Sequence, residues 1–318
     1  MTKIRVSRYR TISLAHYLGS GYQAISLSAA RAIRPLTRVT VVVSTAVLAL
    51  GAQVREDPQA IQRMAAAERA FAAAAAEQGW RDAALAFVAP GAVVVRRAPA
   101  GSPQSADARA WIGDLPPAKL PVALREIWEP AVGQVSSDGT VGWIAGGRAA
   151  LALPLQSLAN QGAFLHVWKR QDEGTWKVSL IDEVPFPSLW KDAAPFAAMP
   201  APDAGTAGGP DESLADAERA IAAGGDAWRD RLAEHVLVLR AGQQPVTGRG
   251  PVLASAASSR GLAARFGDAS VDVAGSDDLG VAWGRYTIAT PRPMAGTWVR
   301  VWHRDIGGRW RIVVQIEK

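Results

Sequence analysis

The pattern of apolar and polar residues predicts helices followed by strands in the first half of the chain. Pro58 to Gln78 is rich in Ala, Glu, Arg and Met, which all favour a helix. A shorter helix is predicted at Arg81–Val88, followed by a valine-rich strand at Val93–Arg97. A further helical stretch at Asp107–Gly113 precedes strands in which apolar and polar residues alternate, which is typical of a sheet with one buried face.

The second half of the chain repeats this succession. Ser213 can cap a helix at Leu214–Ala223, and a shorter helix is predicted at Ala227–His235. A strand at Val236–Arg240 and a helical stretch at Val252–Ser259 come next. Each half then ends in a hairpin in which Trp and Val alternate with Lys, Arg and His, so one face of the hairpin should be buried.

Residue identities repeat along with the pattern. Residues 167–178 match residues 301–312 at a constant offset of 134, which aligns Trp168 with Trp302 and Trp176 with Trp310. Matches further upstream have offsets of 138, 148 and 150, so the order is kept while loops change in length. The sequence therefore predicts a duplicated domain.

The first 52 residues differ from the rest of the chain. They carry seven basic side chains and no acidic one, and they end in the apolar run Val39–Leu50 followed by small residues. This is the pattern of a secretory signal peptide, because the run is short for a membrane-spanning helix. We expect cleavage near Ala49–Gln53 and a periplasmic or secreted mature protein without stable membrane insertion. An uncleaved membrane anchor is the alternative.

Net charge and the absent residue types exclude several functions. The formal charge of +6 comes from the leader: of 35 basic side chains, 28 remain beyond it, against 29 acidic ones. A balanced mature chain gives no reason to expect a nucleic-acid partner. The chain has no cysteine, which excludes disulfides, thiol nucleophiles and thiolate metal sites. No histidine cluster with metal-ligand spacing occurs, so we expect neither a metal nor a cofactor.

We place the domain boundaries where composition changes. The leader covers residues 1–52, a first domain residues 56–190, and a second domain residues 213–318. Between the two domains, residues 191–212 are rich in Ala, Pro and Gly without hydrophobic periodicity, and they read as a surface linker. The two copies could pair with each other within the chain, or the protein could form a homodimer.

An ordered set of motifs in the first copy, repeated more weakly in the second, resembles the NTF2-like superfamily of the SnoaL-like and DUF4440 type. The motifs are Glu68-Arg69-Ala70-Phe71, Trp128-Glu129-Pro130, Ser136-Ser137-Asp138-Gly139, Val141-Gly142, and Val167-Trp168 to Trp176-Lys177-Val178 with Asp182. The resemblance implies an α+β fold of two tandem cones, each a curved antiparallel sheet closed by its N-terminal helices. The family contains isomerases, cyclases, dehydratases and binding proteins, so the resemblance alone assigns no function.

Candidate site residues are those that only the first copy possesses. Asp182 ends the last strand of that copy, where the second copy has Ile316, and a pocket carboxylate could act as a general base. Strand alternation places Glu126 and Trp128 on one face, so a second carboxylate and an aromatic ring could look into the cone together. A capping acid at Asp182, a core ring at Trp128, and a pairing of Glu126 with Arg125 or Arg148 are the structural alternatives.

Two further tryptophans and two histidines are considered as candidate site residues. Trp80 and Trp143 join Trp128 as candidate walls of a ligand pocket, since indole rings suit flat apolar ligands. The equivalents of His166 and His303 in the other copy are Arg300 and Lys169. We therefore expect both histidines to face solvent.

We expect an exported two-domain protein that binds a small apolar molecule in the cone of the first domain. The alternative is a cofactor-free isomerase, cyclase or dehydratase that uses Asp182 or Glu126. A ketosteroid-isomerase-like site would also need an oxyanion donor, and the only tyrosine beyond the leader is Tyr286, in the second copy. A third reading is a structural pair of cones that are filled with side chains.

Overall fold

The structure is a computed structural model that describes residues 58–96, 105–117, 124–187, 190, 195–202, 212–224, 226–258, 264–288 and 294–318. The expected leader, its cleavage site and much of the expected linker lie outside these described residues. We call residues 58–187 the first repeat and residues 212–318 the second repeat.

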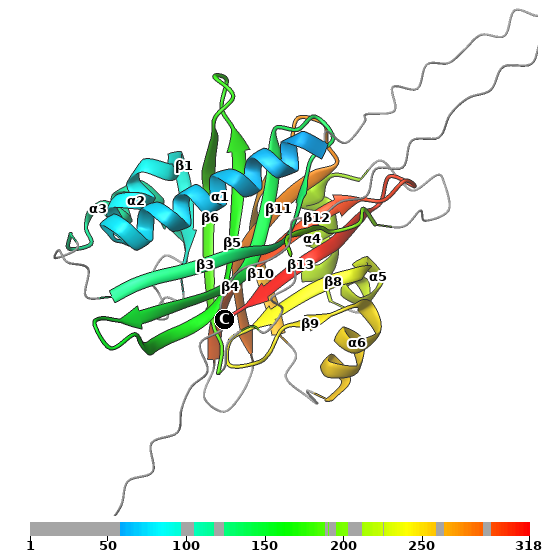
Figure 1. Cartoon of the computed structure of the whole chain (residues 1–318). Coiled ribbons are helices and arrows are strands. Elements are labelled where there is room, and N and C mark those ends of the chain that lie inside the picture. The colour runs from blue at the N-terminus through cyan, green and yellow to red at the C-terminus, as the bar shows by residue number, and fades with distance from the viewer. Residues whose placement is uncertain are drawn as a thin grey trace, which may run out of the picture. The chain divides into compact units, whose positions relative to one another are not determined.

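The described part of the first repeat contains three helices and six strands, and its long first helix has the predicted bounds (Figure 1). The elements are α1 (Pro58–Gln78), α2 (Trp80–Phe87), β1 (Val88–Val95), β2 (Ser105–Asp107), α3 (Ala108–Gly113), β3 (Leu124–Val135), β4 (Val141–Ala152), β5 (Ser157–Arg170) and β6 (Trp176–Pro185).

The second repeat contains the same succession of elements. They are α4 (Leu214–Ala222), α5 (Ala227–Arg231), β8 (Leu232–Arg240), β9 (Val246–Thr247), α6 (Arg249–Ser258), β10 (Ala264–Val273), β11 (Leu279–Ile288), β12 (Met294–Arg304) and β13 (Trp310–Glu317). The hydroxyl oxygen of Ser213 accepts a hydrogen bond from the backbone N–H of Asp216, which is the predicted helix cap. The helix predicted to reach His235 ends instead at Arg231, because the chain already pairs as β8 from Leu232.

The two sheets have equivalent strand orders. The first is β2-β1-β6-β5-β4-β3-β7 and the second is β10-β11-β12-β13-β8-β9, so the second runs in reverse along its equivalent strands. In each sheet the first long strand pairs in parallel with the last one, β1 with β6 and β8 with β13, and the other long neighbours are antiparallel. The predicted α+β class, with two sheets that each follow helices, is confirmed.

Each sheet buries one face against its own helices. In the first repeat, α1 crosses the sheet and contributes Met64 and Phe71 to a core with Trp128 and Trp168 (Figure 1). In the second repeat, α4 contributes Leu214 to a smaller core. Apolar burial on these faces is the main stabilising contribution within each repeat.

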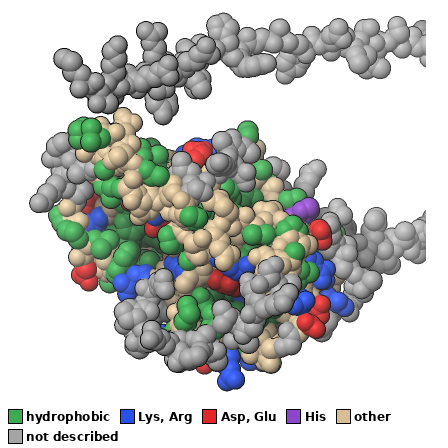
Figure 2. Space-filling model, turned by 90° about the horizontal axis from the view of Figure 1, so that it is seen from below, with side chains coloured by type: hydrophobic (Ala, Val, Ile, Leu, Met, Phe, Trp, Pro, Cys, Tyr) green, Lys and Arg blue, Asp and Glu red, His purple; other side chains and the backbone are tan. Residues whose placement is uncertain are grey.

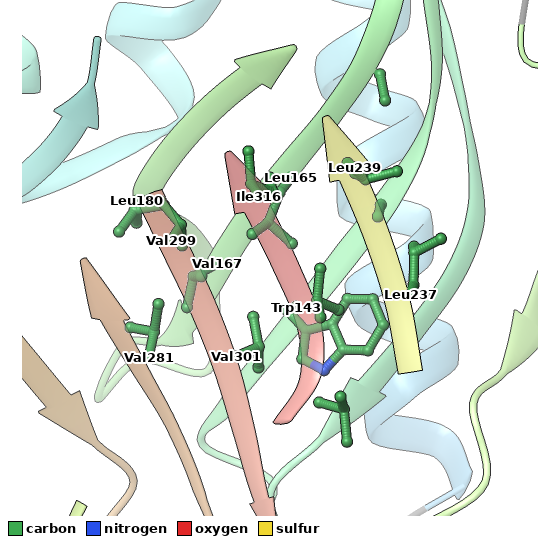
Figure 3. Packing of buried hydrophobic residues seen from close by; sticks show 14 of the residues in the cluster. Trp143, Leu165, Val167, Leu180, Leu237, Leu239, Val281, Val299, Val301 and Ile316 are labelled. Carbon is green, nitrogen blue, oxygen red and sulfur yellow. The ribbon is translucent and has the colours of Figure 1, made fainter. Parts of the chain in front are cut away.

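The other faces of the two sheets share a second core. Trp143, Leu165 and Val167 of the first repeat pack with Val299 and Val301 of the second (Figure 3). Strands of both sheets supply these side chains, which belong to the alternate set that points away from the helices. The two repeats are therefore joined by apolar burial as well as by the chain.

Hairpin turns at one end of the sheets hold the repeats together with reciprocal hydrogen bonds. The backbone N–H of Ser137 donates to the carboxylate of Asp278 at 2.8 Å, and the N–H of Ser276 donates to that of Asp138 at 3.0 Å. The hydroxyls of Ser136 and Thr140 also donate to Asp138 and hold the pKa of its carboxyl below the ordinary value, against the effect of burial.

Part of the expected linker is integrated into the fold. Ala197–Ala198 forms β7, which pairs in parallel with β3, and Met199 is buried in the core between the sheets. The expectation of a purely surface segment is therefore wrong for Met199, whereas Ala197 and Ala198 are exposed. Two alanines show no periodicity, so this pairing could not be predicted from the hydrophobic pattern.

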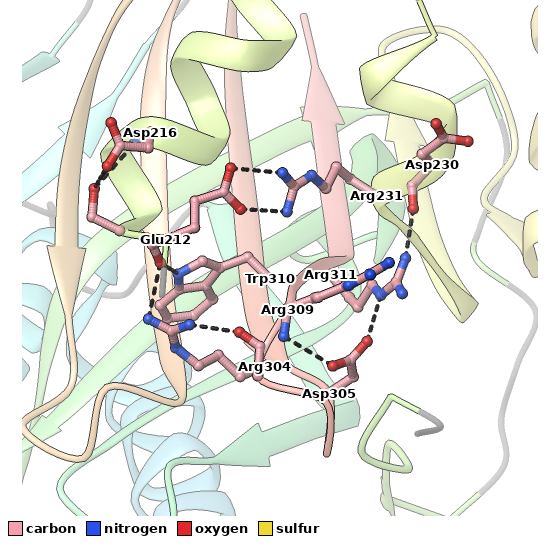
Figure 4. A network of polar contacts seen from close by, with 11 residues as sticks. Glu212, Asp216, Asp230, Arg231, Arg304, Asp305, Arg309, Trp310 and Arg311 are labelled. Carbon is pink, nitrogen blue, oxygen red and sulfur yellow. Dashed lines mark hydrogen bonds and ion pairs between the residues drawn. The ribbon is translucent and has the colours of Figure 1, made fainter. Parts of the chain in front are cut away.

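A polar network fixes the start of the second repeat to its last hairpin (Figure 4). Glu212 pairs with Arg231 at 2.6 Å, and its backbone carbonyl accepts hydrogen bonds from Arg304 and from the indole N–H of Trp310. The guanidinium of Arg304 also stacks 4.4 Å from the Trp310 ring centre. These contacts position the entry into α4.

Charges on the described surface are mixed in sign. On the face shown in Figure 2, Lys and Arg side chains are interspersed with Asp and Glu and with apolar groups. No helix among the described residues is long and apolar enough to cross a membrane.

Candidate functional site

A buried glutamate lies at the centre of the first repeat. Glu68 is on the face of α1 that points into the core, and it is fully buried. Its carboxylate accepts hydrogen bonds from the indole N–H groups of Trp128 at 2.6 Å and Trp168 at 2.8 Å. His166 Nδ1 lies 3.0 Å away. A buried carboxylate needs such partners, because water no longer solvates it.

The second repeat buries the equivalent glutamate. Glu218 of α4 accepts hydrogen bonds from the Trp302 indole at 2.7 Å and from the Arg300 guanidinium at 2.6 Å. Burial raises the pKa of Glu218, and Arg300 opposes this shift. Burial likewise lowers the pKa of Arg300, and Glu218 opposes that shift in turn.

These networks correct our expectation for the histidines. His166 and its equivalent Arg300 are buried against the two glutamates, and His303 is also buried. A basic residue at the same position of both copies was misread as a sign of exposure. The missed signal was in α1, where Glu68 occupies the apolar stripe of Ala60, Met64, Phe71 and Ala75 at helical spacing.

An open pocket of about 310 Å³ lies elsewhere in the first repeat. Trp80 of α2 and Trp111 of α3 form its aromatic wall, with ring centres 6.1 Å apart and planes 69° apart. Arg96, directly after β1, places its guanidinium carbon 5.4 Å from the centre of the Trp111 ring. The buried Nε of Arg96 has no hydrogen-bond partner among the described residues.

The floor of this pocket is charged. Arg148 of β4 pairs with Glu126 of β3 at 2.7 Å and with Glu183 of β6 at 3.3 Å. Burial raises the pKa of Glu126, while the positive charge of Arg148 opposes the shift. Lys318 of the second repeat also lines the pocket. The site therefore combines flat apolar walls with a polar floor to which both repeats contribute.

Asp182 does not line this pocket. It is fully buried on the face that packs against the second sheet, where Leu165 is its strand neighbour. Its carboxylate pairs with the ammonium group of Lys318, which also donates to the backbone carbonyls of Val95 and Glu183. Burial raises the pKa of Asp182, and Lys318 opposes this shift.

The predicted aromatic candidates lie in three different places. Trp80 lines the pocket, where it joins Glu126. Trp128 is buried against Glu68 and does not line the pocket. Trp143 lies in the core between the sheets, and its indole N–H donates to Gln134 at 3.2 Å. Sequence reasoning missed Trp111 and Arg96, because no motif in the sequence marks either position as part of the cone.

The described residues contain no group of three or more His, Asp or Glu side chains that could hold a metal ion. The polar groups of the pocket are two carboxylates, two guanidinium groups and one ammonium group. Such a set can bind a polar or anionic group, and a carboxyl with a raised pKa can transfer a proton.

No protein-family model and no curated protein matches this sequence. Among solved structures, an NTF2-like protein of unknown function from Pseudomonas putida KT2440 is 13% identical over 32% of this chain and 78% of its own, with a TM-score of 0.27. The protein named "putative ketosteroid isomerase" from Parabacteroides distasonis is 13% identical over 36% of this chain and 92% of its own, with a TM-score of 0.29.

An NTF2-like protein with a cystatin-like fold from Novosphingobium aromaticivorans is 20% identical over 32% of this chain and 70% of its own, with a TM-score of 0.25. Each likeness therefore covers about a third of this chain. At these identities it is a likeness of fold and extends to no activity.

Proposed function

We propose that the first repeat binds a small molecule with a flat apolar body and an anionic or polar head in the pocket whose aromatic wall is formed by Trp80 and Trp111. The observation that supports this most strongly is the stacking of Arg96 on Trp111, with a buried N–H that has no described partner. A guanidinium that stacks on an aromatic ring keeps its in-plane N–H groups free for a carboxylate or phosphate.

The lining favours an amphipathic ligand over the purely apolar one that the sequence suggested. Trp80, Trp111 and Ile181 supply apolar surface, whereas Glu126 and Arg148 supply a polar floor. A volume of about 310 Å³ is at the small end of ligand pockets. A single aromatic ring with one acidic group fits this combination of size and chemistry.

A ligand screen with matched variants tests the proposal. Aromatic carboxylates are added to the purified protein, and the shift in its melting temperature is measured. Arg96→Met keeps the aliphatic stem and removes the charge, so it should abolish the shift. Arg125→Met is the matched control, because Arg125 is exposed on β3 next to Glu126. Equal shifts in both variants would refute a role for Arg96.

Proton transfer by Glu126 is a second candidate function. Glu126 lines the pocket and burial raises its pKa, which are properties that a general acid or base requires. A cofactor-free isomerase, cyclase or dehydratase would use such a carboxyl, with Arg96 stabilising the developing negative charge. Glu126→Gln should then abolish turnover of a bound ligand while leaving its binding intact. Unchanged turnover would exclude this role.

We also propose that the protein acts outside the cytoplasm. The support is the basic leader with its apolar run Val39–Leu50, which the structure does not describe. Cell fractionation followed by N-terminal sequencing should find a mature chain that begins close to Gln53. A full-length chain in the cytosol would contradict export, and a full-length chain in the membrane would indicate an anchor.

A further inference from the structure

The edges of the two sheets differ at equivalent positions. In the first repeat, β7 pairs with the outer edge of β3, where Val132 and Gly133 face Ala197 and Ala198. The equivalent strand of the second repeat is β10, which is the last strand of its sheet within the described chain. No described strand therefore covers, in the second repeat, the edge that β7 covers in the first.

The β7 segment shows how the first edge is covered. The N–H of Met199 donates to the carbonyl of Gly133 at 2.9 Å, and the side-chain amide of Gln134 donates to the carbonyls of Met199 and Pro200. The Met199 side chain enters the core between the sheets, whereas Phe196 packs on the helix side. The two residues that flank β7 thus place one apolar side chain on each face of the sheet.

Strand register identifies the equivalent positions on β10. In the first repeat, Gly133 and Gln134 of β3 pair with Ile144 and Trp143 of β4. In the second repeat, Val271 and Asp272 of β10 pair in the same way with Ala282 and Val281 of β11. In both copies, a polar residue thus follows the residue whose backbone groups face the outer edge of the sheet. Val271 is 37% exposed, and it lies where the first repeat receives β7.

A cavity of about 310 Å³ lies beside this edge and is lined in part by β10 and β11, the equivalents of β3 and β4. Val271 and Asp272 of β10 and Val281 and Trp283 of β11 form one wall. The first repeat supplies the other wall, which includes the irregular stretch of β1 between Val88 and Val93. Both sheets therefore enclose the cavity.

Side-chain size explains why one groove is filled and the other is open. Trp143 is fully buried in the same core as Met199, and its indole N–H donates to Gln134. The equivalent residue in the second groove is the smaller Val281. The indole N–H of Trp283, which lines the open groove, is buried and has no hydrogen-bond partner among the described residues. Such a donor is costly unless something binds it.

We propose that the β10 edge and this cavity bind an extended peptide, which adds to the sheet as a parallel strand. The peptide follows the pattern of residues 196–199, which is an aromatic residue, two small residues and an aliphatic residue. The aliphatic side chain enters the cavity and a peptide carbonyl accepts from Trp283. Backbone pairing along an exposed edge supplies affinity, and the cavity supplies specificity.

A synthetic peptide with the sequence of residues 195–201 is the probe, and fluorescence anisotropy with the full chain is the measurement. We expect saturable binding that is roughly tenfold weaker when Met199 of the peptide is replaced by Ala. Hydrogen exchange should slow in residues 264–273 when the peptide is added. The β3 edge should not change, because the chain's own β7 already occupies it at high effective concentration.

Two variants of the protein test the position. Val271→Pro removes a backbone N–H that faces outward by its equivalence to Gly133, so it should abolish binding. Trp283→Phe keeps the ring and removes the indole N–H, so it should weaken binding several-fold even if Val271→Pro does not fold. Arg96→Met, in the other pocket, should leave peptide binding unchanged.

Three results would overturn the proposal. The first is an absence of peptide binding. The second is peptide binding that slows hydrogen exchange in other segments and is not weakened by Trp283→Phe. The third is self-association of the protein that protects residues 264–273 without peptide, which would assign the edge to a second copy of this chain.

Discussion

The two repeats bury the same carboxylate and balance its charge in different ways. In the second repeat, Glu218 pairs with Arg300, whose guanidinium is also held by Gln315 and stacks 4.3 Å from the ring of Phe266. In the first repeat, Glu68 is held by two indole N–H groups, and His166 is the only basic side chain that contacts it among the described residues. A guanidinium is always charged, whereas an imidazole changes its charge near neutral pH.

The residues that surround the buried carboxylate differ together between the two repeats. Where Arg300 provides a permanent charge, the strand that faces it carries Phe266, which has no hydrogen-bond donor. Where His166 replaces the arginine, the equivalent strand position carries Trp128, whose N–H makes up for the lost donor. A buried carboxylate requires several donors, so a change at one donor position is accompanied by a change at another.

The largest expected effect separates the two networks. Glu218→Gln leaves Arg300 buried without its counter-charge, and this should lower the free energy of unfolding by about 3–5 kcal/mol. Urea-induced unfolding measures the loss. Arg219→Gln on the same helix changes only an exposed ion pair and should cost less than about 0.5 kcal/mol. If Glu218→Gln costs less than about 1 kcal/mol, the buried pair is not what holds α4 to its sheet.

A second difference between the repeats is the ion pair at Asp182, where the second repeat has the apolar Ile316. Asp182→Asn should cost about 2–3 kcal/mol, since Lys318 keeps its bonds to the carbonyls of Val95 and Glu183. The double variant with Lys318→Met should recover part of that loss. A double-mutant cycle without coupling would show that the pair does not join the repeats.

Glu68→Gln should cost less than its counterpart in the second repeat, about 1–2 kcal/mol. The amide oxygen can still accept an indole N–H, and no guanidinium is left buried without its counter-charge. Glu77→Gln, an exposed change on the same helix, is the control for the urea measurement. A loss as large as that of Glu218→Gln would mean that the two networks are equally ionic.

Much of the fold could be predicted from the sequence, because it depends on local patterns. The bounds of α1, the Ser213 cap and the duplicated hairpins follow from helix propensity, capping and alternation. The position of β7 could not be predicted, because its pairing with β3 is a tertiary contact of two alanines.

The candidate site was predictable only in part. Trp80 and Glu126 line the pocket, but Asp182 and Trp143 point to the opposite face of the sheet, towards the second repeat. Strand alternation tells which residues share a face, but not which face meets the helices. That second face is buried by the other repeat, so apolar residues line both sides of the strands and the usual contrast is lost.

The smallest expected effect is a pH dependence of stability at Glu126, a position where the second repeat has an apolar residue. Burial raises the pKa of Glu126, whose equivalent is Ala264, above the ordinary value of 4.5. A raised carboxyl pKa means that the fold favours the protonated form. The resulting stability is complete below about pH 4.5, the ordinary value, and is lost as the pH rises through the folded-state pKa. Glu126→Gln imitates the protonated form and should remove this dependence.

The variant should therefore gain stability relative to the original chain as the pH rises from about 4 to 7, by less than about 1 kcal/mol, because Arg148 and partial solvation offset the burial. Urea midpoints at several pH values measure the difference, with Glu129→Gln as the matched control, since Glu129 is exposed on the same strand. A relative loss over this range would mean that the ionised Glu126–Arg148 pair stabilises the pocket. In that case the fold would favour the charged form of the carboxyl, and the proposal that Glu126 donates a proton would be wrong.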